Sequence, residues 1–366
     1  MARRPSSFRL VWVLAATLVS VPLAVRADTT PRAPSVYVVN DGAGTLIAFR
    51  VDVATGALSP ETAPAIATDK NPYSIAIEPA GRWLYVAHGD ASSIVAFGID
   101  SIKGTLTPAP VSRAATDDYP VSVAIDPAGR FLYVSAMVAN AIGVYAINPE
   151  TSSLTPVAGS PFAAGTRPSG NAIHPNGRYL YVASLQSRSV IAFAINRVTG
   201  ALELVPGSPF PAGTNPRAIA IDPRGRFAYV VNAVSNDISS YSIDPQTGGL
   251  VPLPGDPTPT GENPRAVAVA PGGGYLYVAS HFGNSIWAYT IERASGALRP
   301  VPGQPFAAGK NPRGLAIDRR GMFLYCTNYG ANSISVYRID EITGVLNEIP
   351  GSPYGAGDGP FGIAIF

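Results

Sequence analysis

The chain has 366 residues, of which 46% are hydrophobic and only 14% are charged, with a formal net charge of +2. This combination excludes a disordered chain, which needs low hydrophobicity and high net charge, and a broadly basic nucleic-acid-binding protein. The 37 glycines and 36 prolines predict tight turns between short strands rather than the long helices of a bundle or coiled coil.

The first 27 residues have the pattern of a secretory signal peptide. Arginines precede an apolar run from Leu10 to Val25, and the residues at the −3 and −1 positions of a cut after Ala27 are small or apolar. The run is short for a membrane span, which needs about 20 apolar residues. We expect cleavage after Ala27, export to the periplasm or outside of a bacterial cell, and no membrane span afterwards. Arg3-Arg4 leaves twin-arginine export open beside the general route.

Cleavage would also change the charge and the context of the chain. The leader carries four arginines and no acidic residue, so its loss changes the formal charge from +2 to −2. The basic character therefore belongs to the leader, and no nucleic-acid partner is predicted. Cys326 is the only cysteine, so no intrachain disulfide is possible although the destination is oxidising. Residues 28–34 are expected to be a short segment before the fold.

A 48-residue repeat fills positions 31–366 in seven copies without insertions. A proline recurs from Pro72 to Pro360 and a leucine from Leu58 to Leu346 at this spacing. A tyrosine and an alanine recur in the same way, at Tyr37, Tyr85, Tyr133, Tyr181, Tyr229, Tyr277 and Tyr325, and at Ala76, Ala124, Ala172, Ala220, Ala268, Ala316 and Ala364. Repeats of this length are typical of propellers and other repeat architectures.

Each repeat predicts four strands, as the copy beginning at Pro216 illustrates. Residues 217–221 form a short apolar strand, the turn at 222–225 has Asp, Pro and Gly at suitable positions, and residues 227–231 form a second strand. Residues 238–243 are rich in β-branched and aromatic residues, and a fourth, outer strand begins at Leu250. Four strands per unit of 40–50 residues is the pattern of a propeller blade.

The two ends of the chain predict how the ring closes. Residues 35–37 begin a second strand without a first, and residues 360–365 form a first strand without a second. Pairing them completes one blade and removes two exposed sheet edges. We therefore expect residues 35–366 to form a monomeric, all-β, seven-bladed propeller of four antiparallel strands per blade, closed by the N- and C-terminal strands.

The repeat also resembles a known family. The unit "NPRAIAIDPRGRFAYVVN", with Asn232 after the Tyr-Val strand, is similar to the YVTN-repeat and lactonase-type seven-bladed propellers, which include 6-phosphogluconolactonase-like members. The resemblance covers positions 31–366. It implies hydrolysis or formation of sugar-acid or muconate lactones by Arg, His and Glu at the propeller mouth.

The family pattern can be followed residue by residue. It places Arg and then His after the proline of the innermost strand, and Arg217, Arg265 and Arg313 match the Arg. The next residues are Ala218, Ala266 and Gly314, so the His is absent. The family also places Glu after Asn at the end of the second strand, where only Asn40-Asp41 carries a carboxylate. Its His-Pro-x-Gly turn is matched only by the segment beginning at His174.

The three histidines have different surroundings. His174 stands where other repeats have a turn-opening Asp, so we expect a structural turn residue on the face opposite the site. His88 and His281 are expected in loops joining second and third strands, where surface positions are the plain alternative to a catalytic role. Asn171 replaces an apolar residue and is expected to form a structural hydrogen bond. The spacing predicts no metal site, and no cofactor is predicted.

The strongest site candidate is a group of arginines. Arg217, Arg265 and Arg313 share one register in three adjacent blades, with Arg167 nearby. They can hold a carboxylate or phosphate through planar bidentate donors, or each can pair with a carboxylate such as Glu262. His281 is the predicted general acid or base, with a pKa near neutrality, and His88 is a weaker candidate.

Two classes of function therefore remain open. One is an enzyme that hydrolyses a small anionic lactone at the channel mouth, as the family resemblance favours. The other is a non-catalytic propeller that binds a ligand, a glycan or an extracytoplasmic protein partner through its loops, as the regular, insertion-free repeat favours.

Overall fold

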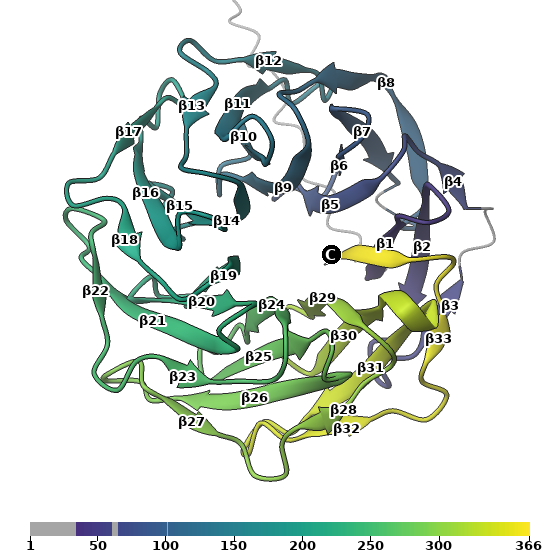
Figure 1. The fold of residues 1–366 in the computed structure, drawn as a ribbon. Helices are drawn as coiled ribbons and strands as arrows, with labels where there is room; N and C mark the ends of the chain where they lie inside the picture. Colours follow the sequence, from purple (N-terminus) through teal and green to yellow (C-terminus); the bar gives the residue numbers. More distant parts are fainter. Residues whose placement is uncertain (1–33, 61–64, 101) are drawn as a thin grey trace, which may run out of the picture. The chain divides into compact units, whose positions relative to one another are not determined.

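The computed structural model describes residues 34–60, 65–100 and 102–366, which belong to one compact unit. The predicted signal peptide at 1–27 and residues 28–33 lie outside the described residues. Seven antiparallel sheets stand as blades around a central axis (Figure 1). This arrangement confirms the predicted all-β, seven-bladed propeller. The described part of the chain contains no helix long and apolar enough to cross a membrane.

The two inner strands of each blade follow the repeat without deviation. The innermost strands begin at the recurring proline: β5 (Pro72–Ile77), β9 (Pro120–Ile125), β14 (Pro168–Ile173), β19 (Pro216–Ile221), β24 (Pro264–Val269), β29 (Pro312–Ile317) and β34 (Pro360–Ile365). The second strands carry the recurring tyrosine: β1 (Ser35–Asn40), β6 (Trp83–His88), β10 (Phe131–Ala136), β15 (Tyr179–Ser184), β20 (Phe227–Asn232), β25 (Tyr275–Ser280) and β30 (Phe323–Asn328).

The outer strands follow in the same order. The third strands are β2 (Thr45–Val51), β7 (Ser93–Ile99), β11 (Ala141–Ile147), β16 (Ser189–Ile195), β21 (Asp237–Ile243), β26 (Ser285–Ile291) and β31 (Ser333–Ile339). The fourth strands are β3 (Leu58–Pro60), β8 (Leu106–Ala115), β12 (Leu154–Pro156), β17 (Leu202–Leu204), β22 (Leu250–Pro252), β27 (Leu298–Pro300) and β32 (Leu346–Glu348). A one-turn 3-10 helix, η1 (Tyr329–Ala331), follows β30.

Six blades also contain a short fifth strand that the sequence did not predict. These strands are β4 (Ile66–Ala67), β13 (Phe162–Ala163), β18 (Phe210–Pro211), β23 (Thr258–Pro259), β28 (Phe306–Ala307) and β33 (Tyr354–Gly355). Each pairs with the third strand of its own blade. In the third blade a turn separates the fourth and fifth strands, and a side chain in this turn replaces the missing ladder partner: Ser160 Oγ accepts a hydrogen bond from Val144 N at 2.9 Å. In the second blade, β8 runs through ten residues unbroken.

The chain ends close the ring as predicted. In the first blade the strand order is β3-β2-β1-β34, and Tyr37 pairs with Ala364 across the β1–β34 ladder. The other six blades are each built from one continuous stretch of chain. Closure leaves no innermost strand without a neighbour and so removes two exposed sheet edges.

The recurring tyrosine and alanine join neighbouring blades. Ala220 lies opposite Tyr229 in its ladder, so the small side chain leaves room for the ring. The Tyr229 hydroxyl then donates to the Gly296 carbonyl of the next blade at 2.9 Å. The same bond recurs from every blade to the next at 2.8–3.3 Å, including Tyr325 to Gly56 between the last and first blades. Between the blades lie the hydrophobic clusters of the core.

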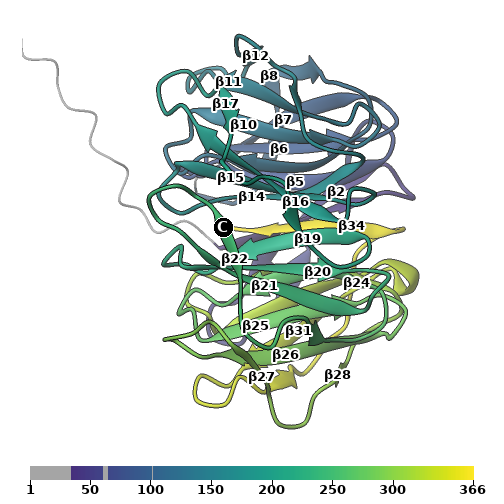
Figure 2. The same cartoon turned by 60° about the vertical axis from the view of Figure 1, so that its left-hand side comes forward.

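Two predicted structural residues are confirmed. The His174 Nδ1 accepts a hydrogen bond from Asn176 N at 3.1 Å, and its Nε2 lies 2.8 Å from the Gly225 carbonyl in the next blade. Asn171 donates from Nδ2 to Ser135 Oγ at 2.9 Å. Because neighbouring strands are antiparallel, the turns between first and second strands, including the one at His174, lie on one face of the ring, and the loops between second and third strands lie on the other, which we call the entrance face. Figure 2 shows the blades from a more lateral direction.

Candidate functional site

A pocket of about 160 Å³ opens at the entrance face and is lined by residues from all seven blades. Each blade contributes the second residue of its innermost strand: Tyr73, Val121, Ser169, Arg217, Arg265, Arg313 and Phe361. Ser122, Met137, Gly170 and Ala218 complete the lining. Because every blade contributes the same register, the pocket lies at the axis of the ring.

The backbone explains why these side chains reach the pocket. The residue before each strand proline has a positive φ, as Asn263 does at 53°, and Asn tolerates this left-handed conformation better than most residues. Directly after the proline the ladder is irregular: the β24–β25 register shifts between Pro264 and Ala266. The backbone of Arg265 is therefore not part of the regular β24–β25 ladder. Bulges of this kind redirect a side chain and are common beside functional sites.

We call Arg217, Arg265 and Arg313 the arginine cradle. Among the described residues, none of the three forms an ion pair with a carboxylate, so the predicted alternative of pairing with Glu262 is wrong. Arg265 donates from Nε to Asn263 Oδ1 at 2.6 Å. The Nε atoms of Arg217 and Arg313 are buried without a hydrogen-bond partner.

Burial and mutual repulsion lower the pKa values of these arginines. Burial lowers the pKa of Arg265 to about 9, with further lowering by Arg217 and Arg313. Burial, followed by repulsion from Arg313, lowers the pKa of Arg217 to about 10. Burial also lowers the pKa of Arg313. All three remain cationic at neutral pH, so the cradle concentrates positive charge that an anion would neutralise.

Arg167 lies at the rim rather than inside the pocket. Its side chain is exposed, its φ is 59°, and its guanidinium contacts Met137 Sδ at 3.3 Å. It is close enough to contribute to lowering the pKa of Arg217. Of the four predicted arginines, three line the pocket and the fourth extends the positive charge towards its opening.

A second ring of residues surrounds the pocket, formed by the first residue of each loop after the second strand. Each of these residues donates its backbone N–H to the carbonyl that precedes an innermost-strand proline, as Asp41 N does to Gly359 O at 2.9 Å. In this ring the Tyr329 hydroxyl donates to Asp41 Oδ2 at 3.4 Å. Burial raises the pKa of Asp41, although Arg313 and Tyr329 oppose the shift. Asp41 is thus a carboxylate of increased basicity beside the cradle.

From the sequence, Asp41 is only a partial match to the family pattern and is not among the predicted site residues. Its partner Tyr329 is 288 residues away in the sequence. The two meet because ring closure places the first and seventh blades side by side. The Asn40-Asp41 pair was the available signal, since it alone keeps a carboxylate at that register.

His281 also belongs to this second ring, but its environment differs from the prediction. It is buried, and its Nδ1 lies 3.4 Å from the Pro312 carbonyl. Because a carbonyl only accepts, this contact places the ring proton on Nδ1 and leaves Nε2 as the acceptor. Burial, together with Arg313 and Arg265, lowers the pKa of His281 to about 4. The expected pKa near neutrality is therefore wrong, and the imidazole is neutral at pH 7.

His88 is not in a loop but is the last residue of β6, and its side chain is 0% exposed. It is not among the residues that line the pocket. Neither ring nitrogen has a hydrogen-bond partner within the described structure, and burial lowers its pKa to about 4. In the described ranges, no group of three or more His, Cys, Asp or Glu side chains is arranged to hold a metal ion.

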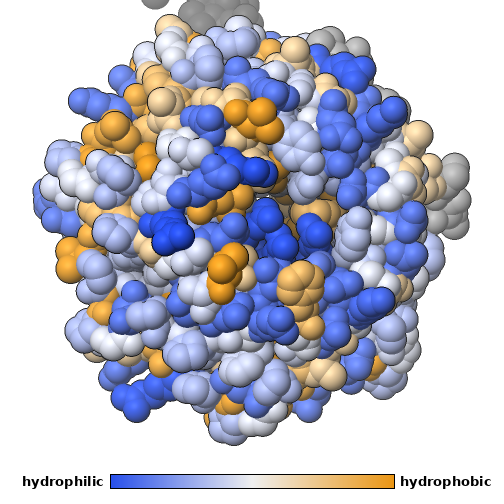
Figure 3. Space-filling model, in the orientation of Figure 1, coloured by the Kyte–Doolittle hydropathy of each residue, from blue (hydrophilic) through white to orange (hydrophobic). Residues whose placement is uncertain are grey.

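The rest of the pocket wall is mostly apolar and aromatic. Tyr73 and Phe361 pack edge to face with ring centroids 4.5 Å apart, and Val121 and Met137 continue this wall. Arg313 stacks on Phe361 with its guanidinium carbon 4.4 Å from the ring centroid. Figure 3 shows hydrophilic residues around the central hollow and hydrophobic patches beside it. Exposed apolar residues of the entrance-face loops are Val138, Val234 and Phe282.

The fold and this site define a propeller with an arginine-lined pocket on its axis. The model of the family "Lactonase, 7-bladed beta-propeller" matches residues 28–124, 110–209, 160–262 and 207–357. The chain belongs to this lactonase family of seven-bladed β-propellers. A comparison with functionally curated proteins found no match.

Solved structures share the fold at low identity. A candidate 6-phosphogluconolactonase from Bacteroides fragilis is 20% identical with a TM-score of 0.80, covering 93% of this chain and 99% of that one. One from Bacteroides uniformis is 20% identical with a TM-score of 0.79, covering 92% and 100%. The periplasmic gluconolactonase of Pseudomonas aeruginosa is 19% identical with a TM-score of 0.78, covering 91% and 98%. At such identities the likeness establishes the fold.

Proposed function

We propose that this protein is an exported enzyme that hydrolyses a small anionic lactone in the axial pocket. The observation that carries the proposal is the arginine cradle: three cationic side chains from adjacent blades line one wall, without an ion-pair partner in the described structure. Arginine suits a carboxylate or phosphate because its donors are planar and paired. Family membership supports the reaction type.

The residues have three roles in this mechanism. Arg217 and Arg265 hold the anionic group of the substrate, and Arg313 stabilises the negative charge that develops on the carbonyl oxygen. Asp41 accepts a proton from the water that adds to the lactone carbonyl carbon. The ring C–O bond then breaks, the departing oxygen takes up the proton, and a hydroxy acid leaves.

A second candidate function is binding without catalysis. One observation favours it: none of the side chains that line the pocket is a carboxylate or an imidazole, since Asp41 and His281 stand in the second ring. In that case the same cradle would bind an anion and release it unchanged. The two functions differ in whether a lactone is consumed, so a hydrolysis screen over sugar and aromatic lactones separates them.

Replacing Arg265 with alanine is expected to weaken anion binding by about 10- to 100-fold, the range expected for losing a hydrogen bond to a charged group. The measurement is isothermal titration with inorganic phosphate and with small carboxylates at low salt. Arg224→Ala is the matched control, because Arg224 is an exposed turn residue on the opposite face. Unchanged affinity in Arg265→Ala would overturn the cradle.

Replacing Asp41 with asparagine is expected to lower kcat by about 10²- to 10⁴-fold, the usual contribution of a general base, while anion affinity is retained. The raised pKa of Asp41 means that activity should fall as the pH decreases through that value, because the protonated carboxyl cannot accept a proton. Glu262→Gln is the control, since it removes an exposed carboxylate in the sixth blade. His281→Ala, assayed in parallel, tests whether Nε2 shares the role. Wild-type turnover in Asp41→Asn would exclude Asp41 as the base.

Export is the remaining part of the proposal and has a direct test. The mature protein, purified from the producing cell, is expected to begin at or near Asp28, because signal peptidase cleaves after small residues such as Ala27. The measurement is N-terminal sequencing of protein from separated cell fractions. Full-length protein that begins at Met1 in a membrane fraction would point instead to an uncleaved anchor.

A further inference from the structure

The chemistry of the pocket walls restricts the body of the ligand as well as its charge. This argument rests on the proposed function, because it takes the arginine cradle as the binding site. A pocket of about 160 Å³ accommodates one six-membered ring, since a protein cavity of about 150 Å³ holds benzene. Size therefore allows either a sugar ring or an aromatic ring. The side chains on the walls distinguish the two.

The pocket offers few acceptors for the hydroxyl groups of a sugar. None of the lining side chains carries a carboxylate or an amide. Of the lining hydroxyls, Ser122 donates to Asn171 Oδ1 at 3.3 Å, and the Tyr73 hydroxyl lies 3.2 Å from that of Tyr119. Ser169 is the remaining hydroxyl of the lining. The hydroxyl donors of a polyhydroxylated ring would exchange water acceptors for few side-chain acceptors there, which is costly.

The part of the wall outside the cradle instead suits a flat apolar ring. Phe361, Tyr73 and Val121 come from the first three blades, whereas the cradle comes from the last three. Aromatic rings pair favourably in edge-to-face and offset geometries, and the Tyr73–Phe361 pair already adopts an edge-to-face packing. The thioether of Met137 adapts well to an aromatic neighbour.

The cradle itself favours more than one negative charge. Arg313 is fixed by stacking on both Phe361 and Tyr329, with its guanidinium carbon 4.4 and 4.7 Å from their ring centroids. Stacking uses the faces of a guanidinium and leaves its in-plane donors free. Three cations, two of them with a buried Nε that lacks a partner, are neutralised better by a dianion than by a monoanion.

We infer that the ligand of this pocket is an aromatic dianion, that is, a single aryl ring with two acidic groups, rather than a polyhydroxylated sugar acid. The acidic groups lie against the arginine cradle, and the ring lies against Phe361, Tyr73 and Met137. As a substrate, such a compound would carry its lactone on the aryl ring.

The test is a calorimetric comparison of two dicarboxylates of equal charge at the same ionic strength. Phthalate represents the aromatic dianion and glucarate the polyhydroxylated one, and neither needs to be hydrolysed. We expect phthalate to bind at least tenfold more tightly than glucarate, and benzoate, with one charge, to bind more weakly than phthalate. Met137→Gln places an amide in the apolar wall at similar side-chain length and is expected to reduce the preference for phthalate. Met322→Gln, on the opposite face, is the control and should keep it.

The outcomes separate this inference from the proposed function. If glucarate binds as tightly as phthalate or more tightly, and Arg265→Ala weakens both, the cradle stands and the aromatic assignment is wrong. If neither dianion binds to the wild-type protein at low salt, the cradle fails and the inference fails with it. If Met137→Gln misfolds, the phthalate-to-glucarate ratio of the wild-type protein still decides the case.

Discussion

Raising the pH above about 10 is expected to unfold the whole propeller in one steep transition. In every blade a buried tyrosine donates its hydroxyl proton to a carbonyl of the next blade. Burial raises the pKa of six of these tyrosines above the ordinary value of 10: Tyr85, Tyr133, Tyr181, Tyr229, Tyr277 and Tyr325. In the unfolded chain they ionise first. Stability is therefore complete below pH 10 and falls as the pH rises through the window between the unfolded and folded pKa values.

The expected slope is large because the groups act together. Each such tyrosine lowers the free energy of unfolding by about 1.4 kcal/mol per pH unit, so six lower it by about 8 kcal/mol per unit. The measurement is a pH titration that follows circular dichroism and tyrosinate absorbance in the same sample. Because the chain has 17 tyrosines, the buried ones are followed through the tyrosinate absorbance that is lost in Tyr229→Phe, and this part of the signal should change together with the circular dichroism. Ionisation of Tyr229 near pH 10 with the fold intact would contradict the buried, hydrogen-bonded state of its hydroxyl.

The variant Tyr229→Phe is the matched control for this titration. It leaves the Gly296 carbonyl without its donor, so we expect it to lose about 1–2 kcal/mol of stability at neutral pH. It also removes one of the six titrating groups, so its alkaline slope should be smaller by the contribution of one proton. The exposed side chain of Arg224 can be replaced in parallel to show that an unrelated change leaves the slope unaltered.

The fold could be predicted from the sequence because the repeat indicates both where the strands lie and how the ring closes. Tyr37 begins the series without an innermost strand and Ala364 ends it without a second strand, and these two residues pair in the first blade. The fifth strands could not be predicted, because two residues such as Phe162 and Ala163 form no hydrophobic pattern. In the third blade the side chain of Ser160, in the turn before the fifth strand, satisfies a backbone N–H of the third strand.

The positions of the site residues could be predicted where the repeat symmetry determines them. Their burial and orientation could not be predicted, because these depend on local packing. In a closed ring, residues of equal register lie at equal height around the axis, which is why Arg217, Arg265 and Arg313 meet. A shared register does not tell which way a side chain near a strand end points. The sequence therefore predicts a surface loop position for His88, which is in fact fully buried. The lowered pKa of His281 depends on burial that the spacing of the repeat does not reveal.

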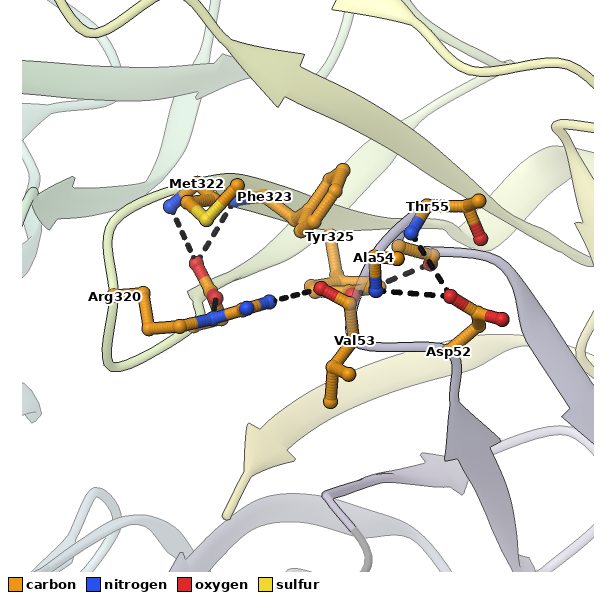
Figure 4. A network of polar contacts seen from close by, with 10 residues as sticks. Asp52, Val53, Ala54, Thr55, Arg320, Met322, Phe323 and Tyr325 are labelled. Carbon is orange, nitrogen blue, oxygen red and sulfur yellow. Dashed lines mark hydrogen bonds and ion pairs between the residues drawn. The ribbon is translucent and has the colours of Figure 1, made fainter.

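The contacts between the seventh and first blades explain why the last strand, β34, contributes more to stability than its length suggests. Figure 4 shows the seventh and first blades joined by a polar network in which Arg320 donates to the Val53 carbonyl and Tyr325 belongs to the same contact. Asp52 Oδ1 accepts hydrogen bonds from Ala54 N and Thr55 N, both at 2.9 Å, which shapes the loop that receives Arg320. This network joins the seventh blade to the loop between β2 and β3 of the first blade.

Truncation after Gly355 is therefore expected to destabilise the entire ring rather than one blade. It removes β34, which pairs with β1, and the buried Ala356, and it takes Ile363 and Ala364 from the clusters on both sides of the first blade. Complete burial of a side chain such as Ile is worth about 1.5–3 kcal/mol, so losing several partly buried ones approaches the total stability of a domain, about 5–15 kcal/mol. The measurements are soluble yield and thermal melting by circular dichroism.

Two controls make the truncation result specific. Removing residues 1–27 should leave the melting temperature unchanged, since the predicted signal peptide precedes the propeller. Adding a synthetic peptide of residues 356–366 to the truncated chain should restore the melting transition, because the exposed edge of β1 has unpaired backbone N–H and C=O groups with which the peptide can pair. If the truncated chain melts within a few degrees of the full chain, then the six complete blades are stable alone and closure by the terminal strands is not what holds the ring together.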